Sequence, residues 1–328
     1  MSVIFSRAPL RISLGGGGTD LPSYYGEHGG YLLSGSIDKY IYMLTHTVFQ
    51  KRYRMKYSDT EEVDTIAEIK HPILRETLLR HWQGNPLEIA SVADVPAGTG
   101  MGSSGAFVVC LIKALSMAKR RSITPGDLAE AACGIELDVL KEPVGKQDQY
   151  VSAHGGICAY AFNADGTVDV ESLDLDETTL HKLRHNLMLF YTGEARSAST
   201  ILSDQVKRTE ESDSAMVENL HRTKEMGVRS RALLESGDLE SYAELMHEHW
   251  ENKRTRSPGM TDECIDNLYT LARRSGALGG KLVGAGGGGF LLVYAPHPEN
   301  TRQAMAAAGA AELPFDFEFQ GAIGTEYA

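Results

Sequence analysis

Apolar and polar positions follow both strand and helix periods in the first third of the chain. The segment from Tyr31 to Leu44 is rich in aromatic and β-branched residues, which is typical of a strand, and Leu87 to Ala93 predicts another. Ile73 to Trp82 favours a helix. From Phe107 to Leu115, apolar residues recur at i, i+1, i+4, i+5 and i+8, which predicts a helix with one buried face.

The pattern continues with a second helix and a hairpin. Thr124 and Pro125 are typical of an N-cap and a first helical position, and the helix they open carries apolar residues as far as Leu140. Gly155 to Phe162 predicts a strand, and the turn at residues 163–166 follows it. Strands and helices therefore mix throughout this half of the chain.

The composition shifts near residue 186. Asn186 to Tyr191 predicts a strand, and long polar helices are expected from Ile201 to Leu234 and from Leu239 to Lys253. The last third alternates helix, glycine loop, strand, helix and strand, the final strand running from Leu313 to Phe319.

Composition narrows the class of protein. At 328 residues, two domains are expected, and the net charge of −12 argues against a nucleic-acid partner. The four cysteines are scattered without a C-x-x-C pair, which disfavours zinc and a disulfide framework. The amino terminus has no apolar signal-peptide stretch, and no apolar run is long enough for a membrane span. We expect a cytoplasmic protein with no membrane partner.

A glycine-dense loop before the Phe107 helix is the first candidate site. Such a loop leaves backbone N–H groups unpaired at a helix N-terminus, where they and the helix dipole suit a phosphate. The loop fits neither the Walker pattern nor the complete dinucleotide fingerprint, and a turn before a core helix is the plain alternative. The candidate phosphate-binding residues are Pro96, Gly98, Gly100, Met101, Gly102, Ser103, Ser104 and Gly105.

Two further glycine clusters lie far away in the sequence. A short strand containing Arg11 leads into residues 15–18, which are all glycine and are followed by Thr19 and Asp20. The other cluster runs from Lys281 to Gly289 and leads into a strand. Glycine allows close approach of the backbone to a ligand, so the three loops together indicate a ligand held between distant segments.

These three motifs, in their order and spacing, resemble those of the GHMP kinases, a family that includes galactokinase, homoserine kinase, mevalonate kinase and phosphomevalonate kinase. Residues 96–106 resemble the family's P-x-G-x-G-L-G-S-S-A loop, with Met101 for Leu and Gly105 for the first Ala. The resemblance implies an α+β fold of two domains. An N-terminal domain, residues 1–185, would resemble ribosomal protein S5 domain 2. A ferredoxin-like C-terminal domain, residues 186–328, would face it across an active-site cleft.

The resemblance also implies roles for particular residues, with ATP and Mg²⁺ as cofactors. Asp148, in a stretch similar to the galactokinase G-x-x-D-Q, would accept or orient the acceptor hydroxyl proton, with Arg11 beside it. Ser104 and Glu136 would bind magnesium, since the family places a metal-binding glutamate about a dozen residues before its catalytic aspartate. The alternatives are an exposed helix glutamate, a solvated loop aspartate and a salt bridge from Arg11 at a strand edge.

The acceptor-binding residues follow from the same resemblance. Glycines stand where galactokinase has Glu-His, and the N-terminal motif is more similar to D-glycero-D-manno-heptose 7-phosphate kinases, which implies phosphorylation of the C1 hydroxyl of that sugar phosphate. A sugar phosphate needs a cationic pocket, for which Arg196, Lys253 and Arg254 are the candidates, with charged residues on a helix surface as the alternative. The substrate-binding candidates are Gly17, Gly18, Thr19, Asp20, Gly286, Gly287 and Arg196.

Several alternatives remain open at this point. The acceptor could be an unphosphorylated sugar, as in fucokinases or galactokinases, and Asp20 could instead cap a helix that starts near Leu21. A regulator that binds sugar and ATP without catalysis, a dinucleotide-dependent oxidoreductase and a nonenzymatic interaction domain are the other classes. The expected partner is a small-molecule sugar or sugar phosphate, and the protein is expected to be a monomer or a homodimer.

Overall fold

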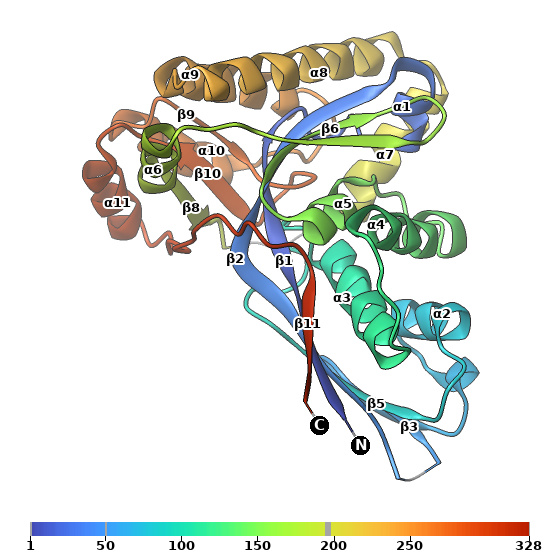
Figure 1. Ribbon diagram of the computed structural model, residues 1–328. Coiled ribbons are helices and arrows are strands. Elements are labelled where there is room, and N and C mark those ends of the chain that lie inside the picture. The colour runs from blue at the N-terminus through green and yellow to red at the C-terminus, as the bar shows by residue number, and fades with distance from the viewer. Residues whose placement is uncertain (1, 50, 194–197, 328) are drawn as a thin grey trace.

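The computed structural model describes residues 2–49, 51–193 and 198–327 (Figure 1). The chain forms two sheets, with helices packed on both. The strands are β1 Val3–Gly15, β2 Gly30–Thr47, β3 Tyr53–Lys56, β4 Thr60–Val63, β5 Leu87–Ala93, β6 Ile157–Phe162, β7 Val168–Ser172, β8 Leu187–Tyr191, β9 Gly279–Leu282, β10 Phe290–Tyr294 and β11 Ile323–Tyr327.

Eleven α-helices lie in the described residues, four of them in succession between β8 and β9. They are α1 Pro22–His28, α2 Pro72–His81, α3 Ser103–Ala118, α4 Pro125–Cys133, α5 Gln147–His154, α6 Glu177–Asn186, α7 Ala198–Glu210, α8 Ser214–Glu235, α9 Leu239–Arg254, α10 Glu263–Arg274 and α11 Pro298–Ala307. A short 3₁₀ helix spans Ile66–Glu68, and a π-helix, η2, spans Gly134–Val139.

The first sheet has the order β11-β1-β2-β5-β3-β4, with β6 and β7 joined to β2. The long strand β2 bonds to β6 through Gly30–Gly35 and to β5 through Ile41–Thr47, so it connects two halves of the sheet. Helices α2 to α5 lie on one side of this sheet (Figure 1). The apolar residues predicted for α3, among them Val108, Leu111 and Leu115, are buried there.

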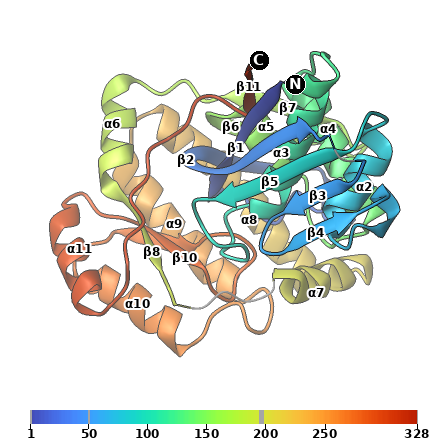
Figure 2. The same ribbon diagram turned by 90° about the horizontal axis from the view of Figure 1, so that it is seen from below.

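The second sheet has the order β8-β10-β9 and is antiparallel. The segment after α11 runs along its β8 edge, where the Tyr191 amide donates to the Ala311 carbonyl at 2.8 Å and the Leu313 amide to the Leu189 carbonyl at 2.8 Å. Counting that segment, the strands follow the order 4-1-3-2 of a ferredoxin-like βαββαβ unit. Figure 2 shows this sheet beside the first, with α6, α10 and α11 on its outer side.

Helices α8 and α9 lie across the top of both sheets (Figure 1). The side chains of α8 pack on β1 and β2, and α9 packs on β9. Strand β11 returns to the first sheet, where it pairs with β1. Among the helices of the described residues, none combines the length and the apolar character that crossing a bilayer requires.

Three element predictions need correction. The expected helix Ile201–Leu234 is two helices, α7 and α8, because Ser212 has φ 55° and Asp213 caps the start of α8. The helix capped by Thr124 becomes a π-helix after Cys133. Within the expected strand Leu313–Phe319 the described residues form one isolated bridge, Phe317 with Ile37, and the last strand is β11.

Candidate active site

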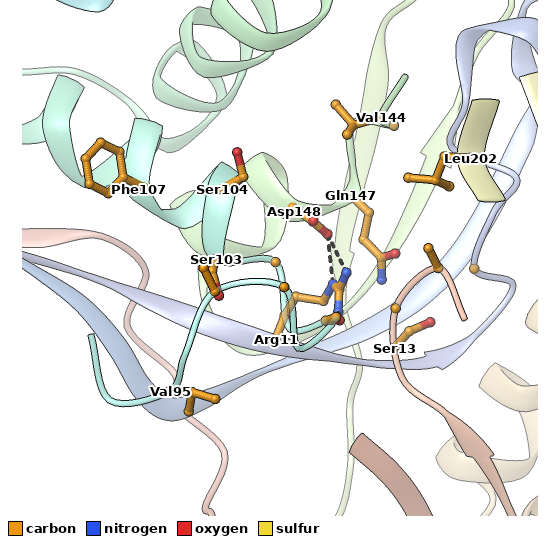
Figure 3. Close-up of a pocket in the computed structure, with 18 of the residues that line it drawn as sticks. Arg11, Ser13, Val95, Ser103, Ser104, Phe107, Val144, Gln147, Asp148 and Leu202 are labelled. Carbon is orange, nitrogen blue, oxygen red and sulfur yellow. Dashed lines mark hydrogen bonds and ion pairs between the residues drawn. The ribbon is translucent and has the colours of Figure 1, made fainter. Parts of the chain in front are cut away.

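A cavity of about 850 Å³ lies between the two sheets and is lined by residues from nearly every predicted motif. The glycine loop before α3 forms one wall, and the N-terminal glycine loop forms another. Helix α9 and strand β9 close the side nearest the second sheet. Figure 3 shows the central part of this cavity, with Ser103 and Ser104 at the start of α3 and Arg11 and Asp148 at its floor.

The loop before α3 has the backbone that a phosphate site requires. Gly98, Gly100 and Gly102 have φ between 77° and 79°, a left-handed conformation that favours glycine. Gly102 is the N-cap of α3 and has no side chain to bond the first-turn N–H groups. The Ser103 hydroxyl is buried without a hydrogen-bond partner among the described residues. Donors at this helix N-terminus are therefore available to an anion.

Arg11 and Asp148 form an ion pair at the floor of the cavity (Figure 3). The Nε and Nη2 atoms of Arg11 both lie 2.8 Å from Oδ1 of Asp148. Arg11 also donates to the Gly100 carbonyl, which ties β1 to the glycine loop. Asp148 lies in the first turn of α5, where a helix favours an acid. Within the described ranges, no hydrogen bond occupies its other oxygen, Oδ2.

Ser104 and Glu136 also come together. The Ser104 hydroxyl donates to Oε1 of Glu136, and the Gln149 amide donates to Oε2 at 2.5 Å. The π-helix η2 carries Glu136, whose side chain is buried directly behind Ser104. Burial raises the pKa of Glu136 to about 7, with a smaller contribution from nearby Asp148. A hydroxyl and a carboxylate beside a phosphate loop are the hard oxygen donors that fit Mg²⁺.

The N-terminal loop is held against α5 by Asp20. Its carboxylate accepts from the Gln147 amide at 3.1 Å and from the Gly18 amide at 3.2 Å. It does not cap α1, which has Leu21 as N-cap and no side-chain cap bond. Burial raises the pKa of Asp20, and the charge of Asp148 adds to that effect.

The predicted substrate-binding residues divide into two groups. Gly17, Gly18 and Asp20 line the cavity, whereas Thr19 is buried behind it and bonds the Gly16 and Tyr31 carbonyls. In the third glycine loop Gly284 and Ala285 line the cavity. Gly286 and Gly287 do not line the cavity and lie against Met260 instead. The Gly287 amide donates a hydrogen bond to the Met260 carbonyl at 2.9 Å. Arg196 lies outside the described residues.

One end of the cavity is apolar and aromatic, and no motif in the sequence predicts it. His71 stacks on Phe107 with ring centroids 5.2 Å apart, and Tyr57 meets His71 edge-on at 4.7 Å. Ile73 and Val92 complete this wall. Burial lowers the pKa of His71, which favours the neutral form of its imidazole ring. The end is suited to an aromatic base.

The end of the cavity formed by α9, the residues just after it and β9 is cationic. Lys253, which the sequence analysis placed in a cationic pocket, lines it together with His249, Arg256 and Lys281. All four residues are at least 95% buried, with exposures of 5%, 3%, 3% and 2%. Arg254 does not belong to the group, because it points outward and pairs with Glu251 and Asp266. His249, Lys253 and Arg256 stand at i, i+4 and i+7, a helical spacing that was available in the sequence.

Together these features define a class: an enzyme that binds a nucleotide phosphate at a helix N-terminus and sets an Arg–Asp pair against a second ligand. The comparisons identify the family. The family model of the GHMP kinase N-terminal domain matches residues 69–156, and that of the C-terminal domain matches residues 230–311. The chain belongs to the GHMP kinase family, has its two-domain fold and is an ATP-dependent kinase.

Several individual relatives match most of the chain. It is 27% identical over 306 residues to the D-glycero-alpha-D-manno-heptose 7-phosphate kinase of Campylobacter jejuni, with 90% of each chain covered. It is 26% identical over 327 residues to the galactokinase of Thermococcus kodakarensis, covering 88% of this chain and 89% of the relative. The solved structure of a D-glycero-D-manno-heptose 1-phosphate kinase from Bacteroides thetaiotaomicron superimposes with a TM-score of 0.81 at 23% identity, covering 99% of each chain.

Proposed function

We propose that this kinase transfers the γ-phosphoryl group of ATP to the anomeric C1 hydroxyl of a heptose 7-phosphate. The main support for the transfer step is the Arg11–Asp148 pair. Both arginine contacts are to Oδ1 of Asp148, so Oδ2 is left for a ligand. A kinase of an unphosphorylated sugar is the second candidate, since the galactokinase of Thermococcus kodakarensis matches the chain over a similar length.

Phosphoryl transfer depends mostly on positioning and on stabilisation of charge. Oδ2 of Asp148 accepts the proton of the attacking hydroxyl, or a hydrogen bond that orients it. Arg11 keeps that carboxylate in place and stabilises the negative charge that develops on the transferred group. The N–H groups at the start of α3 bind the phosphates of the nucleotide.

Ser104 and Glu136 would hold Mg²⁺, which neutralises phosphate charge when it is bound. The protein's own contribution is to fix both oxygen donors. Gln149 holds one carboxylate oxygen of Glu136, and Ser104 stands between the other oxygen and the cavity. The aromatic end formed by Tyr57, His71 and Phe107 would take the adenine base.

The choice of acceptor rests on the relative from Campylobacter jejuni and on the N-terminal motif. Gly17 and Gly18 present backbone and no side chain to the cavity, and a Cβ at Gly18 would clash with Nη1 of Arg256, so glycine there lets this cation lie against the N-terminal loop. A heptose 7-phosphate converted to its 1,7-bisphosphate would serve the synthesis of nucleotide-activated heptose.

The direct test is release of ADP from Mg²⁺-ATP with a panel of acceptors. The panel contains heptose 7-phosphate, mannose, galactose, fucose, mevalonate and homoserine. We expect turnover with heptose 7-phosphate only. Turnover on a free sugar alone would establish the second candidate, and no turnover on any sugar would contradict the proposal.

The role of Asp148 is tested by Asp148→Asn, which preserves shape and an acceptor for Arg11 but removes basicity. We expect kcat to fall by about 10²- to 10⁴-fold, the range for loss of a general base. ATP binding, measured by calorimetry, and the melting temperature should remain close to those of the wild type. A variant with near-wild-type turnover would remove Asp148 from this role.

A further inference from the structure

The cationic end of the cavity contains more positive charge than the surrounding protein balances. Lys253, Arg256 and Lys281 line it, and among the described residues none of the three has a carboxylate within 4.0 Å. Asp20 is the acid that acts most strongly on Arg256, while Asp148 is already paired with Arg11. Buried charges normally have a counter-ion, because taking an unpaired ion out of water is costly.

The partners that these cations do have fix their positions and leave their charge unbalanced. Lys253 donates to the carbonyls of Leu282 and Gly284, the first at 2.9 Å. Arg256 donates to the side chains of Asn219 at 2.9 Å and Thr223 at 2.7 Å. Nη1 of Arg256 also donates to the Gly17 carbonyl at 3.3 Å, so these neutral acceptors hold both cations at the wall of the cavity. They supply none of the negative charge that the group lacks.

His249 is an independent sign of an absent ligand. Its side chain lines the same end, is 3% exposed and has neither Nδ1 nor Nε2 hydrogen-bonded within the described part of the chain. Buried polar atoms are rarely left without a partner unless a ligand or water completes them. A neutral imidazole here can donate one N–H to an oxygen of that ligand.

We infer that Lys253, Arg256, Lys281 and His249 bind the phosphate group that the sugar-phosphate acceptor already carries. The inference rests on the proposed function, since it assumes that the acceptor occupies this end while ATP occupies the aromatic end. A phosphate dianion supplies several acceptor oxygens and the missing negative charge. The residues thereby select a sugar phosphate over the corresponding free sugar.

The titration of the group agrees with this geometry. Burial, with the charges of Arg11 and Arg256, lowers the pKa of Lys281 to about 7, and burial lowers that of Arg256 to about 10. An anion bound among them would reverse these shifts, because an opposite charge favours the protonated amine.

The test compares Lys281→Met with the wild type on heptose 7-phosphate and on the same heptose without its phosphate. Met is close to Lys in length and removes only the charged end. We expect kcat/KM for the sugar phosphate to fall by about 10- to 100-fold, the loss of one buried charged hydrogen bond. The values for the free sugar and KM for ATP should change by less than about twofold. Inorganic phosphate should compete with heptose 7-phosphate in the wild type and more weakly in the variant.

Arg254→Gln is the matched control, because Arg254 follows Lys253 directly yet lies outside the cavity. It should leave all three kinetic constants unchanged. Arg256→Gln serves as a second variant if melting shows that Lys281→Met does not fold. Equal losses on both sugars, or a rise in KM for ATP, would place the cations on the transferred phosphate and overturn the inference. Efficient turnover of the free heptose by the wild type would also overturn it.

Failure of the proposed function can be separated from failure of this inference by calorimetry. If the wild type phosphorylates no sugar but binds heptose 7-phosphate, and Lys281→Met loses that binding, the phosphate site stands and the proposed reaction fails. If the wild type binds neither heptose 7-phosphate nor inorganic phosphate, the inference itself fails.

Discussion

At the scale of single residues, Glu136 is a deeply buried carboxyl that we also propose as a magnesium ligand. Its carboxyl is 1% exposed and bonded to Ser104 and Gln149, and its ordinary pKa of 4.5 rises to about 7. The folded protein therefore holds this proton more tightly than the unfolded chain does. Through this group alone, the free energy of unfolding decreases as pH rises from about 4.5 to 7. Bound Mg²⁺ would offset that cost.

Glu136→Gln tests this account without metal present. The amide has the shape of the protonated acid but never ionises, so the variant should melt above the wild type at about pH 8 and together with it at about pH 5. It should also lose most Mg²⁺-dependent turnover. Glu211→Gln, at an exposed glutamate far from Glu136 in the sequence, is the control and should show neither effect. A constant difference between the two pH values would show that Glu136 is not the group that titrates.

Several residues of the site could be predicted from the sequence, and others could not. Arg11, Asp148, Ser104 and Glu136 lie in motifs, and the structure brings each pair together. The contribution of Lys281 to a cation cluster depends on β9 running beside α9, and no local pattern shows this.

At the scale of elements, the glycine loop before α3 and the C-terminal glycine loop, residues 284–289, pack against each other. A Cβ at Gly284 would lie 2.5 Å from the Cα of Gly100, and one at Gly289 would lie 2.3 Å from the Thr99 carbonyl oxygen. The glycines of the third loop therefore allow two backbones to touch. Only Gly284 and Ala285 of residues 284–289 also border the cavity.

Gly284→Ala should weaken this contact and the activity together. Gly284 has φ 76°, and Gly259 has φ 77° with nothing within 4 Å of an added Cβ, so Gly259→Ala measures the conformational cost alone. That cost is about 1–2 kcal/mol. We expect Gly284→Ala to lose about 1–3 kcal/mol more, together with ATP affinity, because it must displace the phosphate loop. Equal melting temperatures for the two variants would contradict the packing argument.

Element predictions succeeded where the signal was local. Helix α2 and strand β5 match the expected ranges within one residue, and Thr124 caps α4 through the Asp127 amide at 3.1 Å. The break between α7 and α8 was missed because the flanking residues are polar and helical on both sides. The expected strand at Leu313–Phe319 failed because pairing, and not propensity, decides where the last strand forms.

At the scale of the whole molecule, the cavity exists only because both sheets contribute to it. The first sheet and its helices supply Arg11, Asp148 and the phosphate loop, whereas α9, the residues just after it and β9 supply the cations. We propose that the aromatic end binds the nucleotide and the cationic end binds the acceptor. The two-domain fold and the family followed from three motifs in order.

The most direct test of this account is phosphorus NMR of the product formed from Mg²⁺-ATP and heptose 7-phosphate. The account predicts a new phosphate signal coupled to the anomeric proton, with the 7-phosphate signal retained and ADP formed in equal amount. A new phosphate at any other carbon, or ATP consumption without a new sugar phosphate, would contradict it.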